Sequence, residues 1–419
     1  MNAFSLRVAP RLADIPQDVW DRCANPQNPK GDSGLNAKSE SGSQALDSNA
    51  QGDSISQEET FNPFLSYAFL SALEDSGCVG AAAGWAPAHA VLEVAGAIVA
   101  VAPAYRKSHS MGEYVFDQGW ADAYRRAGGR YYPKLQVSVP FTPVPGRRLL
   151  VATSAPVGAE AALIEGLRAM PGAIGVSSLH VTFTTAREWR ALGAAGLLQR
   201  TGQQFHFTNH GYRDFDDFLD ALASRKRKAV RKERAAAQTG VEIDWATGPT
   251  LTEAHWDAFY RFYADTTARK WGAPYLNRRF FSLLGERLGG RVALVTARRE
   301  GRPIAGALNL RGDRALYGRY WGAVEDRPFL HFELCYYQAI DYALRQRLAR
   351  VEAGAQGEHK LARGYLPVPT YSAHAFEDPR LTRAVGDFLA AERRQVAETI
   401  ELYGAYAPFR RGDTPEDGV

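Results

Sequence analysis

The sequence predicts an α/β protein with mixed sheets, built from two consecutive units. Segments with helical spacing of apolar residues alternate with short, β-branched segments that are bounded by Gly and Pro. Both halves repeat a rough order of helix, antiparallel strands, helix and strand, which permits a duplicated fold. In the second half a strand at 315–321, a helix at 331–348 and a strand at 350–354 follow one another, as in a parallel crossover.

The first unit is expected at residues 1–200, with a disordered insertion at about 25–60. The insertion has no aromatic residue and consists mostly of Ser, Asn, Gln, Gly and Asp, so it cannot bury enough apolar surface to offset its ordering entropy. A helix is expected directly after it, with Asn62 as N-cap, Pro63 at the first helical position and Gly77 as the stop.

The first unit continues with "HAVLEV" and "AIVAVAPAY" around an Ala-Gly pair, which is typical of a β-hairpin. A strand at 177–183 and a helix over "AREWRALGAAGLLQ" complete it.

The second unit is expected at residues 201–390, and a helix end with a tail at 391–419. It opens with the strand "QFHFTNHGY" and one helix from Phe215 to a stop at Gly240. Thr250 and Glu253 form a capping-box pattern before another helix. The strand "VEIDWA" precedes that helix. Three strands follow it, "RVALVTAR", "RPIAGALNL" and "RALYGRYWG". The crossover helix, the strand "RVEAG" and a final amphipathic helix at 380–403 complete the unit.

Composition and charge exclude several functional classes. A formal net charge of +4 is too small to indicate a nucleic-acid or membrane partner by itself. The longest charge-free apolar run is less than half of the roughly 20 residues that a membrane-spanning helix needs, and the N-terminus lacks the apolar core of a signal peptide. Cys23, Cys78 and Cys335 are far apart and odd in number, which favours reduced thiols and a cytoplasmic location.

The candidate site lies where the two parallel strands are expected to end. In open α/β sheets ligands bind at the carboxyl edge of the strands, so the two clusters that follow these strands should meet. The expected substrate-binding residues of this edge are Tyr320, Trp321, Gln356, Lys360 and Arg363. Lys360 and Arg363 could hold a phosphate or a carboxylate.

Four residues are expected to handle protons at this edge. Glu358 or His359 could accept a proton from an attacking amine, and Tyr371 or His374 could protonate a leaving group. The alternative is a surface loop whose charged groups face water, with His374 a hydrogen-bonded strand residue. No metal site is expected, because the histidines lack the spacing of a metal-binding motif.

A basic segment, "SRKRKAVRKER", forms a second candidate site at 224–234. On a helix Arg225, Lys228 and Lys232 share one face, and Arg231 lies on a neighbouring face. Such a helix could hold the phosphates of a nucleotide-bearing donor or an RNA backbone, or could simply be a solvated face. No aromatic residues are interleaved with it, which argues against sequence-specific reading of RNA.

Four segments together resemble a known family. They are "KSHSMGEYVFDQGWADAY", "YYPKLQVSVPFTPVPGRRLL", "FHFTNHGY" with the following basic helix, and "GAQGEHKLARGYLPVPTYSAH". They resemble bacterial FemAB-like proteins of the GNAT acyltransferase superfamily, which are labelled peptidoglycan biosynthesis or recognition proteins. The resemblance implies two tandem GNAT-like domains and an amine that attacks the carbonyl of an aminoacyl-tRNA or acyl-CoA donor lying between the two parallel strands.

The resemblance also implies a small-molecule or cell-wall precursor as acceptor, with tRNA as a further partner and no tightly bound cofactor. One departure concerns the donor. The usual GNAT pyrophosphate loop is absent before the crossover helix, where this chain has "GAVEDRPFLHFEL", and this argues against ordinary acetyl-CoA. The leading interpretation is an acyl- or aminoacyltransferase, and the alternative is a non-catalytic protein that binds cell-wall fragments or RNA on the same scaffold.

Overall fold

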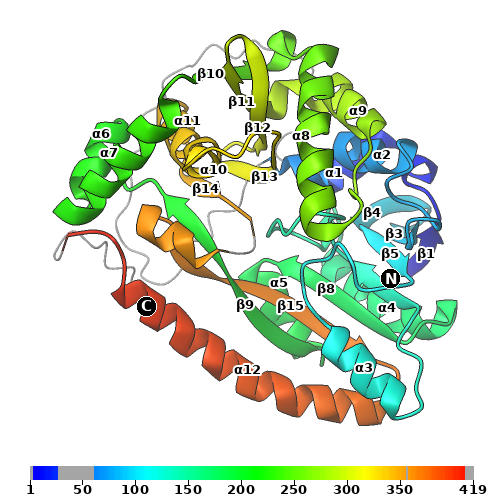
Figure 1. The fold of residues 1–419 in the computed structure, drawn as a ribbon. Coiled ribbons are helices and arrows are strands. Elements are labelled where there is room, and N and C mark those ends of the chain that lie inside the picture. Colours follow the sequence, from blue (N-terminus) through cyan, green and yellow to red (C-terminus); the bar gives the residue numbers. More distant parts are fainter. Residues whose placement is uncertain (1–2, 27–60, 355–356, 411–419) are drawn as a thin grey trace.

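A long mixed sheet runs through both halves of the chain in the computed structural model, which describes residues 3–26, 61–354 and 357–410 (Figure 1). The sheet has 11 strands, and a second sheet of four strands lies in the first half. In order across the long sheet the strands are β10 (Glu242–Thr247), β11 (Val292–Arg299), β12 (Arg302–Arg311), β13 (Ala315–Ala323), β14 (Arg350–Glu352), β9 (Leu198–Thr208), β15 (Leu366–Phe376), β8 (Ser178–Thr184), β6 (Lys134–Val137), β5 (Ala104–Lys107) and β2 (Trp85–Pro87).

The four-stranded sheet contains the hairpin that the sequence predicted. Its order is β1 (Phe4–Ala9), β3 (His89–Val94), β4 (Ala97–Ala102) and β7 (Leu150–Val151). The turn between β3 and β4 places both Ala95 and Gly96 at positive φ, 50° and 80°. Two positive φ values are typical of a type I′ turn, whose twist matches that of the flanking strands.

Helices cover the sheets and connect their strands. They are α1 (Gln17–Ala24), α2 (Tyr67–Asp75), α3 (Gln118–Arg126), α4 (Ala159–Ile174), α5 (Ala186–Ala194), α6 (Phe215–Ala221), α7 (Ser224–Gln238), α8 (Glu253–Trp271), α9 (Arg278–Leu288), α10 (Leu330–Phe332), α11 (Gln338–Arg345) and α12 (Pro379–Ala405), with η5 (Glu333–Tyr337), a π-helix, between α10 and α11, and the short 3₁₀ helix η6 (Glu358–Arg363). None of the helices in the described part of the chain is both long and apolar enough to cross a membrane.

The predicted helix boundaries need two corrections. The helix expected from Phe215 to Gly240 is two helices, because the backbone turns at Leu222 and Ala223, where Leu222 forms a β-bridge with Phe409. The capping box assigned to Thr250 and Glu253 is also shifted. Thr252 caps α8 together with His255, whereas Thr250 bonds with Thr247.

The parallel crossover that was predicted for the second half is present, and the first half contains a similar one. β13 and β14 pair in parallel at Ala315–Arg350, Leu316–Val351 and Tyr317–Glu352, and α10, η5 and α11 connect them. In the first half β6 and β8 also pair in parallel, with α4 in the connection. Repetition of this unit agrees with the duplicated element order of the sequence.

The two halves share their central strands. β9 pairs with β14 from the second half, and β15 pairs with both β9 and β8. The predicted domain boundary near residue 200 lies within β9 and stays a prediction. Apart from Asn25 and Pro26, the predicted insertion at 25–60 lies outside the described residues, and so does Gln356.

Residues on either side of the predicted insertion lie together. The backbone N–H of Asn62 donates to Asn25 Oδ1 at 2.8 Å, and both residues are buried. Asn62 Oδ1 also accepts from the N–H of Phe64, so Asn62 is an N-cap as predicted, although it caps a 3₁₀ turn and Ser66 caps the α-helix that follows.

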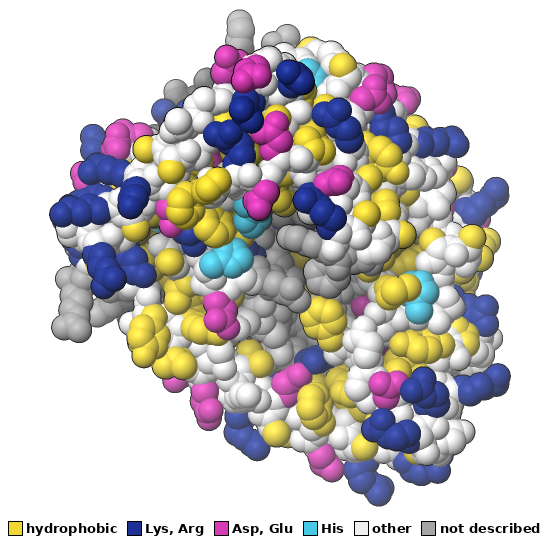
Figure 2. Space-filling model, viewed as in Figure 1, with side chains coloured by type: hydrophobic (Ala, Val, Ile, Leu, Met, Phe, Trp, Pro, Cys, Tyr) yellow, Lys and Arg dark blue, Asp and Glu magenta, His cyan; other side chains and the backbone are white. Residues whose placement is uncertain are grey.

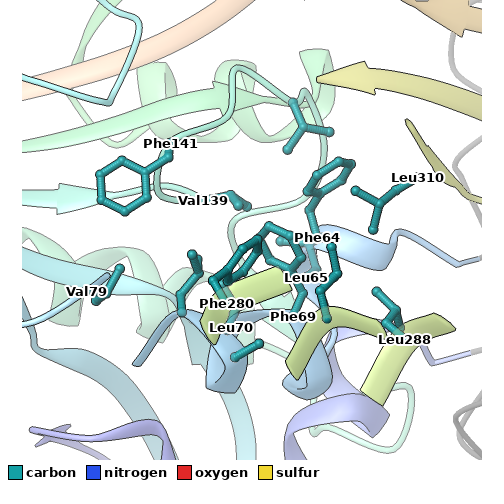
Figure 3. Packing of buried hydrophobic residues seen from close by; sticks show 14 of the residues in the cluster. Phe64, Leu65, Phe69, Leu70, Val79, Val139, Phe141, Phe280, Leu288 and Leu310 are labelled. Carbon is teal, nitrogen blue, oxygen red and sulfur yellow. The ribbon is translucent and has the colours of Figure 1, made fainter. Parts of the chain in front are cut away.

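A hydrophobic core joins the two halves (Figure 3). The ring of Phe64 lies edge-on to Phe69 at 5.0 Å and to Tyr317 of β13 at 5.3 Å. Phe69 in turn lies 5.8 Å from Phe280 of α9. Because residues of both halves bury the same apolar surface, we expect them to unfold together.

We predict that Phe64→Ala lowers the free energy of unfolding by about 3–5 kcal/mol, because the removed ring leaves a cavity between the halves. Denaturant titration followed by both fluorescence and circular dichroism measures this change. Val157→Ala is the control, since Val157 is fully exposed. Two separate transitions, only one of which responds to Phe64→Ala, would contradict the shared core.

Candidate active site

The parallel ladder between β13 and β14 ends after Tyr317 and Glu352, and the side chain of Arg319 lies at this end. A β-bulge follows Gly318, so that Arg319 has no partner of its own in the pairing with β12. Arg319 Nη1 donates to the backbone oxygens of Gly318, at 2.9 Å, and of Glu352, at 3.3 Å. Its Nη2 donates to the Glu352 carboxylate, at 3.3 Å. The guanidinium group therefore bridges the two strands at the point where their own hydrogen bonds stop.

Tyr320 and Trp321 point to opposite faces of β13. Tyr320 donates its hydroxyl to the backbone oxygen of Phe141 at 2.9 Å and packs against Tyr263. Tyr320 therefore faces the first half. The prediction that Tyr320 binds substrate at the strand edge is wrong. The ring of Trp321 lies 5.2 Å from His331, at the start of the crossover helix.

His359 reaches the other side of His331. The two imidazole rings are 6.2 Å apart, so the segments that follow β13 and β14 meet across His331, as the sequence predicted. His359 Nε2 lies 2.8 Å from the hydroxyl of Tyr336. The His359 residue as a whole is exposed, but neighbouring groups partly desolvate its imidazole. This desolvation, together with the charges of Lys360 and Arg363, lowers the pKa of His359 below the ordinary histidine value.

Glu358 turns away from this cluster. Its carboxylate accepts a hydrogen bond of 2.5 Å from the hydroxyl of Tyr403 on α12, and its side chain is exposed. Of the two alternative proton acceptors, Glu358 is therefore corrected, and His359 stays a prediction.

Lys360 and Arg363 stabilise the turn that carries His359. Lys360 is buried and donates to the backbone oxygen of Gly354 at 2.9 Å. Burial, and then the charge of Arg319, lowers the pKa of Lys360 to about 7. Arg363 donates to the backbone oxygen of His359 and forms a bidentate ion pair with Glu233 of α7. Both residues were predicted to hold a phosphate, but the structure places them beneath the turn.

The π-helix η5 connects this turn to the basic helix. A π turn inside an α-helix is rare and often marks a functional site. Tyr336 of η5 bonds with His359, and Tyr337 donates to Glu233. Glu333, which is fully buried, accepts from Arg234 of α7 and from two glutamine amides. The inner face of α7 is therefore fixed against the crossover helix.

The outer face of α7 carries exposed positive charge next to the turn. Arg225, Lys228 and Lys232 are exposed, and Arg231 is exposed with a distant ion pair of 3.7 Å to Asp216. Figure 2 shows Lys and Arg side chains gathered at the left, where Figure 1 places α6 and α7. α7 packs against both η5 and η6, so the two predicted candidate sites are neighbours.

Tyr371 and His374 belong to another part of the molecule. Both lie on β15, whose first residue, Leu366, adjoins η6. At about 3.3 Å per residue of strand, Tyr371 lies roughly 17 Å and His374 roughly 26 Å further along. Both residues are therefore too far along β15 to donate a proton next to His359, and that prediction is wrong.

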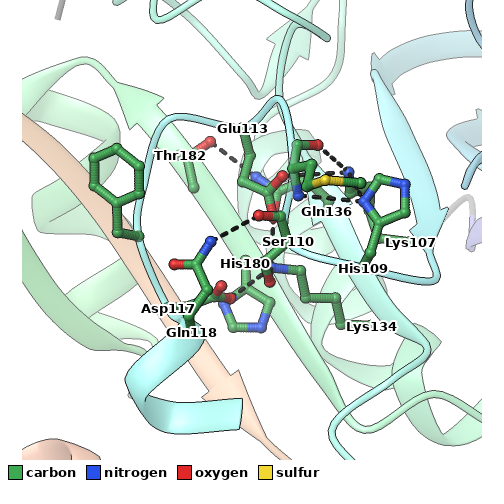
Figure 4. A network of polar contacts seen from close by, with 12 residues as sticks. Lys107, His109, Ser110, Glu113, Asp117, Gln118, Lys134, Gln136, His180 and Thr182 are labelled. Carbon is green, nitrogen blue, oxygen red and sulfur yellow. Dashed lines mark hydrogen bonds and ion pairs between the residues drawn. The ribbon is translucent and has the colours of Figure 1, made fainter. Parts of the chain in front are cut away.

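A buried network of charges, which the sequence analysis missed, lies in the first half (Figure 4). Lys134 of β6 donates to Glu113 at 2.7 Å, to Asp117 at 2.5 Å and to Ser110 at 2.8 Å. Burial alone would raise the pKa of Asp117, but Lys134 outweighs it and lowers that pKa to about 2. Lys107 lies 3.2 Å from Glu113.

The signal for this network is present in the sequence only as polar residues between Lys107 and Gln118. This segment carries part of the family resemblance, but its pattern predicted no site. Its partner, Lys134, lies in a short strand whose other residues gave no indication that a lysine is fully buried.

The family model for FemAB-like proteins, described as peptidoglycan biosynthesis/recognition, matches residues 11–411. This chain belongs to the FemAB-like family. The mixed sheets with their repeated parallel crossover confirm the predicted α/β fold class, and the two tandem GNAT-like domains stay a prediction. No curated protein matches the sequence.

Several solved structures resemble this FemAB-like chain at low identity. FemX has a TM-score of 0.48 and 11% identity, over 77% of this chain and 94% of FemX. A tandem GNAT protein from the clavulanic acid biosynthesis pathway has a TM-score of 0.47 and 12% identity, over 90% of this chain and 99% of its own. L-PGS from Bacillus licheniformis has a TM-score of 0.47 and 11% identity, over 79% and 98%.

Within residues 3–26, 61–354 and 357–410 of the FemAB-like chain, no three His, Cys, Asp or Glu side chains are grouped so that they could hold a metal ion. Three of its histidines are instead buried in polar contacts. His180 Nδ1 and His374 Nδ1 are 2.8 Å apart, and His206 bonds with Gln204. Burial lowers the pKa of His180 to about 3, that of His206 to about 4 and that of His374 well below its ordinary value.

We predict that these histidines destabilise the fold in acid. Because their folded-state pKa values lie below the unfolded value of about 6.5, the stability is present above that pH and is lost as the pH falls toward the folded values. Each should contribute a fall of about 1.4 kcal/mol between about pH 7.5 and 5.5. His206→Gln should reduce the fall by that amount in urea denaturation, whereas His210→Gln, an exposed control, should leave it unchanged.

Proposed function

We propose that this FemAB-like chain is an acyl- or aminoacyltransferase that moves an acyl group from an activated donor to an amine of a peptidoglycan precursor. The observation that carries the proposal is the position of His359. It sits on the turn that follows the parallel pair, beside the exposed basic face of α7. The family description supports the precursor as the acceptor class.

In the proposed reaction the acceptor amine attacks the carbonyl carbon of the donor ester or thioester. A carbon–nitrogen bond forms, the carbon–oxygen or carbon–sulfur bond breaks, and the leaving hydroxyl or thiol takes up one proton. The amine loses one proton, which His359 accepts. When the Nε2–H of His359 donates to Tyr336, its Nδ1 is the proton acceptor, and the lowered pKa keeps the imidazole neutral near pH 7.

The basic outer face of α7 would hold the phosphates of the donor. Both aminoacyl-tRNA and acyl-CoA carry phosphates, so this face fits either donor. The carbonyls of Gly318 and Glu352, which face the gap between β13 and β14, already accept from Arg319. The donor would therefore approach from the side of α10 and η6 rather than between the strands.

We predict that His359→Ala lowers the rate of acyl transfer by about 10²–10⁴-fold, which is the usual contribution of a general base. Glu358→Gln is the matched control, and its rate should stay within about twofold of wild type since that carboxylate contacts α12. Both residues are exposed, so the melting temperatures should not change. Full transfer activity in His359→Ala would refute the assignment.

The basic face has its own test. Replacing Arg225, Lys228 and Lys232 with Gln should raise the KM for the donor and make the salt dependence of KM shallower, because fewer phosphate contacts release fewer counterions. The control replaces Arg126, Arg130 and Arg383 with Gln, which removes the same charge from exposed positions elsewhere. An equal effect of both triple variants would show that net charge, and not this face, attracts the donor.

A non-catalytic binding protein is the second candidate. Arg319 favours it, since its side chain occupies the gap in which the family resemblance places the donor. Calorimetry of the full chain with acyl-CoA, charged tRNA and muropeptides separates the two candidates. Muropeptide binding without any donor binding would support recognition alone.

A further inference from the structure

One carboxylate of the basic helix α7 reaches the turn that carries His359. It belongs to Glu233, whose side chain is 19% exposed. Arg363 of η6 donates from Nη2 to both carboxylate oxygens, at 3.0 and 2.9 Å, and from Nε to Oε2, at 3.2 Å. Tyr337 of η5 donates its hydroxyl to Oε2 as well. A single side chain therefore joins α7 to both η5 and η6.

Arg363 carries the contact from Glu233 onward to His359. Its Nη1 donates to the backbone oxygen of His359 at 2.7 Å. Its guanidinium carbon also lies 3.5 Å from the ring centroid of Phe332, and that ring is 5.5 Å from the imidazole of His359. The side chain of Arg363 is only 9% exposed, so its charge is tolerated there because Glu233 compensates it. The backbone of His359 and one wall beside its ring thus depend on this ion pair.

The same carboxylate also supports the hydroxyl group that bonds with His359. That hydroxyl belongs to Tyr336, whose oxygen lies 2.8 Å from His359 Nε2. Tyr336 precedes Tyr337 in the π-helix η5, so the bond from Tyr337 to Glu233 fixes the turn from which Tyr336 projects. Arg363 and η5 hold His359 from two sides, at its backbone oxygen and at its ring nitrogen. Glu233 is the residue that these two supports share.

From these contacts we infer that Glu233 is a positioning residue for the proposed transfer reaction and acts on His359 through Arg363 and η5. The inference rests on the proposed function, because it assigns a task to a residue beside that site. The exposed basic face that would hold the donor belongs to the same helix, so α7 sets the place of the donor relative to the base. Such alignment matters for the rate, since a misplacement of about 1 Å can cost about 10²-fold.

Steady-state transfer to a muropeptide, with acyl-CoA and with charged tRNA as donors, tests the inference. Glu233→Gln keeps the size of the side chain and removes its charge, and we expect kcat to fall about 10–100-fold. The KM for the donor should stay within about twofold, because the exposed basic face is unchanged. Asp220→Asn is the matched control, since it removes the same charge from another ion pair of α7, with Arg227 at 3.1 Å. Its kcat and KM should both stay within about twofold of wild type.

Arg363→Lys tests the same link from its other end and serves if Glu233→Gln does not fold. Lysine keeps the charge but lacks the planar fork that bonds with Glu233 and His359 together, so kcat should fall as in Glu233→Gln. The double variant should lose no more than either single variant, because both changes break one path. Wild-type kcat in Glu233→Gln, a raised KM with unchanged kcat, or additive losses in the double variant would each overturn the inference.

Nuclear magnetic resonance of ¹⁵N-labelled histidine tests the positioning without any donor. The bond to Tyr336 should hold the neutral imidazole of His359 in one tautomer in wild type and in Asp220→Asn. In Glu233→Gln both tautomers should appear, because the supports of His359 are released. If wild type transfers no acyl group from either donor, the proposed function fails. A single tautomer in Glu233→Gln would instead overturn the positioning role itself.

Discussion

The end of the parallel ladder between β13 and β14 is the constraint on which the candidate active site depends. Beyond Tyr317 and Glu352 the backbone groups of the two strands no longer pair with each other, and buried carbonyls need donors. Arg319 supplies these donors from within the sheet. The crossover helix then starts close to the end of β13, and the turn after β14 brings His359 to it.

Each half of the molecule contains a buried cationic side chain that holds the neighbouring segments in position. Lys134 in the first half and Arg319 in the second are almost completely buried, and each is surrounded by carboxylates or backbone oxygens. A charge in such a place is tolerated only when its partners are well positioned, and removal of one partner leaves an uncompensated charge. These residues therefore position their surroundings: Lys134 holds the segment that presents Tyr114, and Arg319 holds the strand end.

The long strands β9 and β15 connect the candidate active site with a cavity of about 200 Å³ that these strands and α12 line. β15 adjoins η6 at its start and the cavity at its middle, and β9 pairs alongside it for most of its length. α12 packs across both strands and contributes Glu392 to the cavity and Tyr403 to Glu358 (Figure 1). The candidate active site and the cavity therefore lie along the same two strands.

The sequence by itself determined the local elements and their order. Caps such as Asn62, the Ala95-Gly96 turn, the basic helix and the strand–helix–strand crossover depend on neighbouring residues and periodicity, and they could be predicted. The meeting of the segments after Trp321 and Gly354 followed from that topology alone.

Only the tertiary structure decided where single side chains point. The bulge at Arg319 shifts the register of Tyr320 and Trp321 against β12, and contacts between residues far apart in the chain turn Glu358 toward Tyr403 and bury Lys360. Such contacts leave no periodic trace in the sequence, because each depends on where a distant element packs.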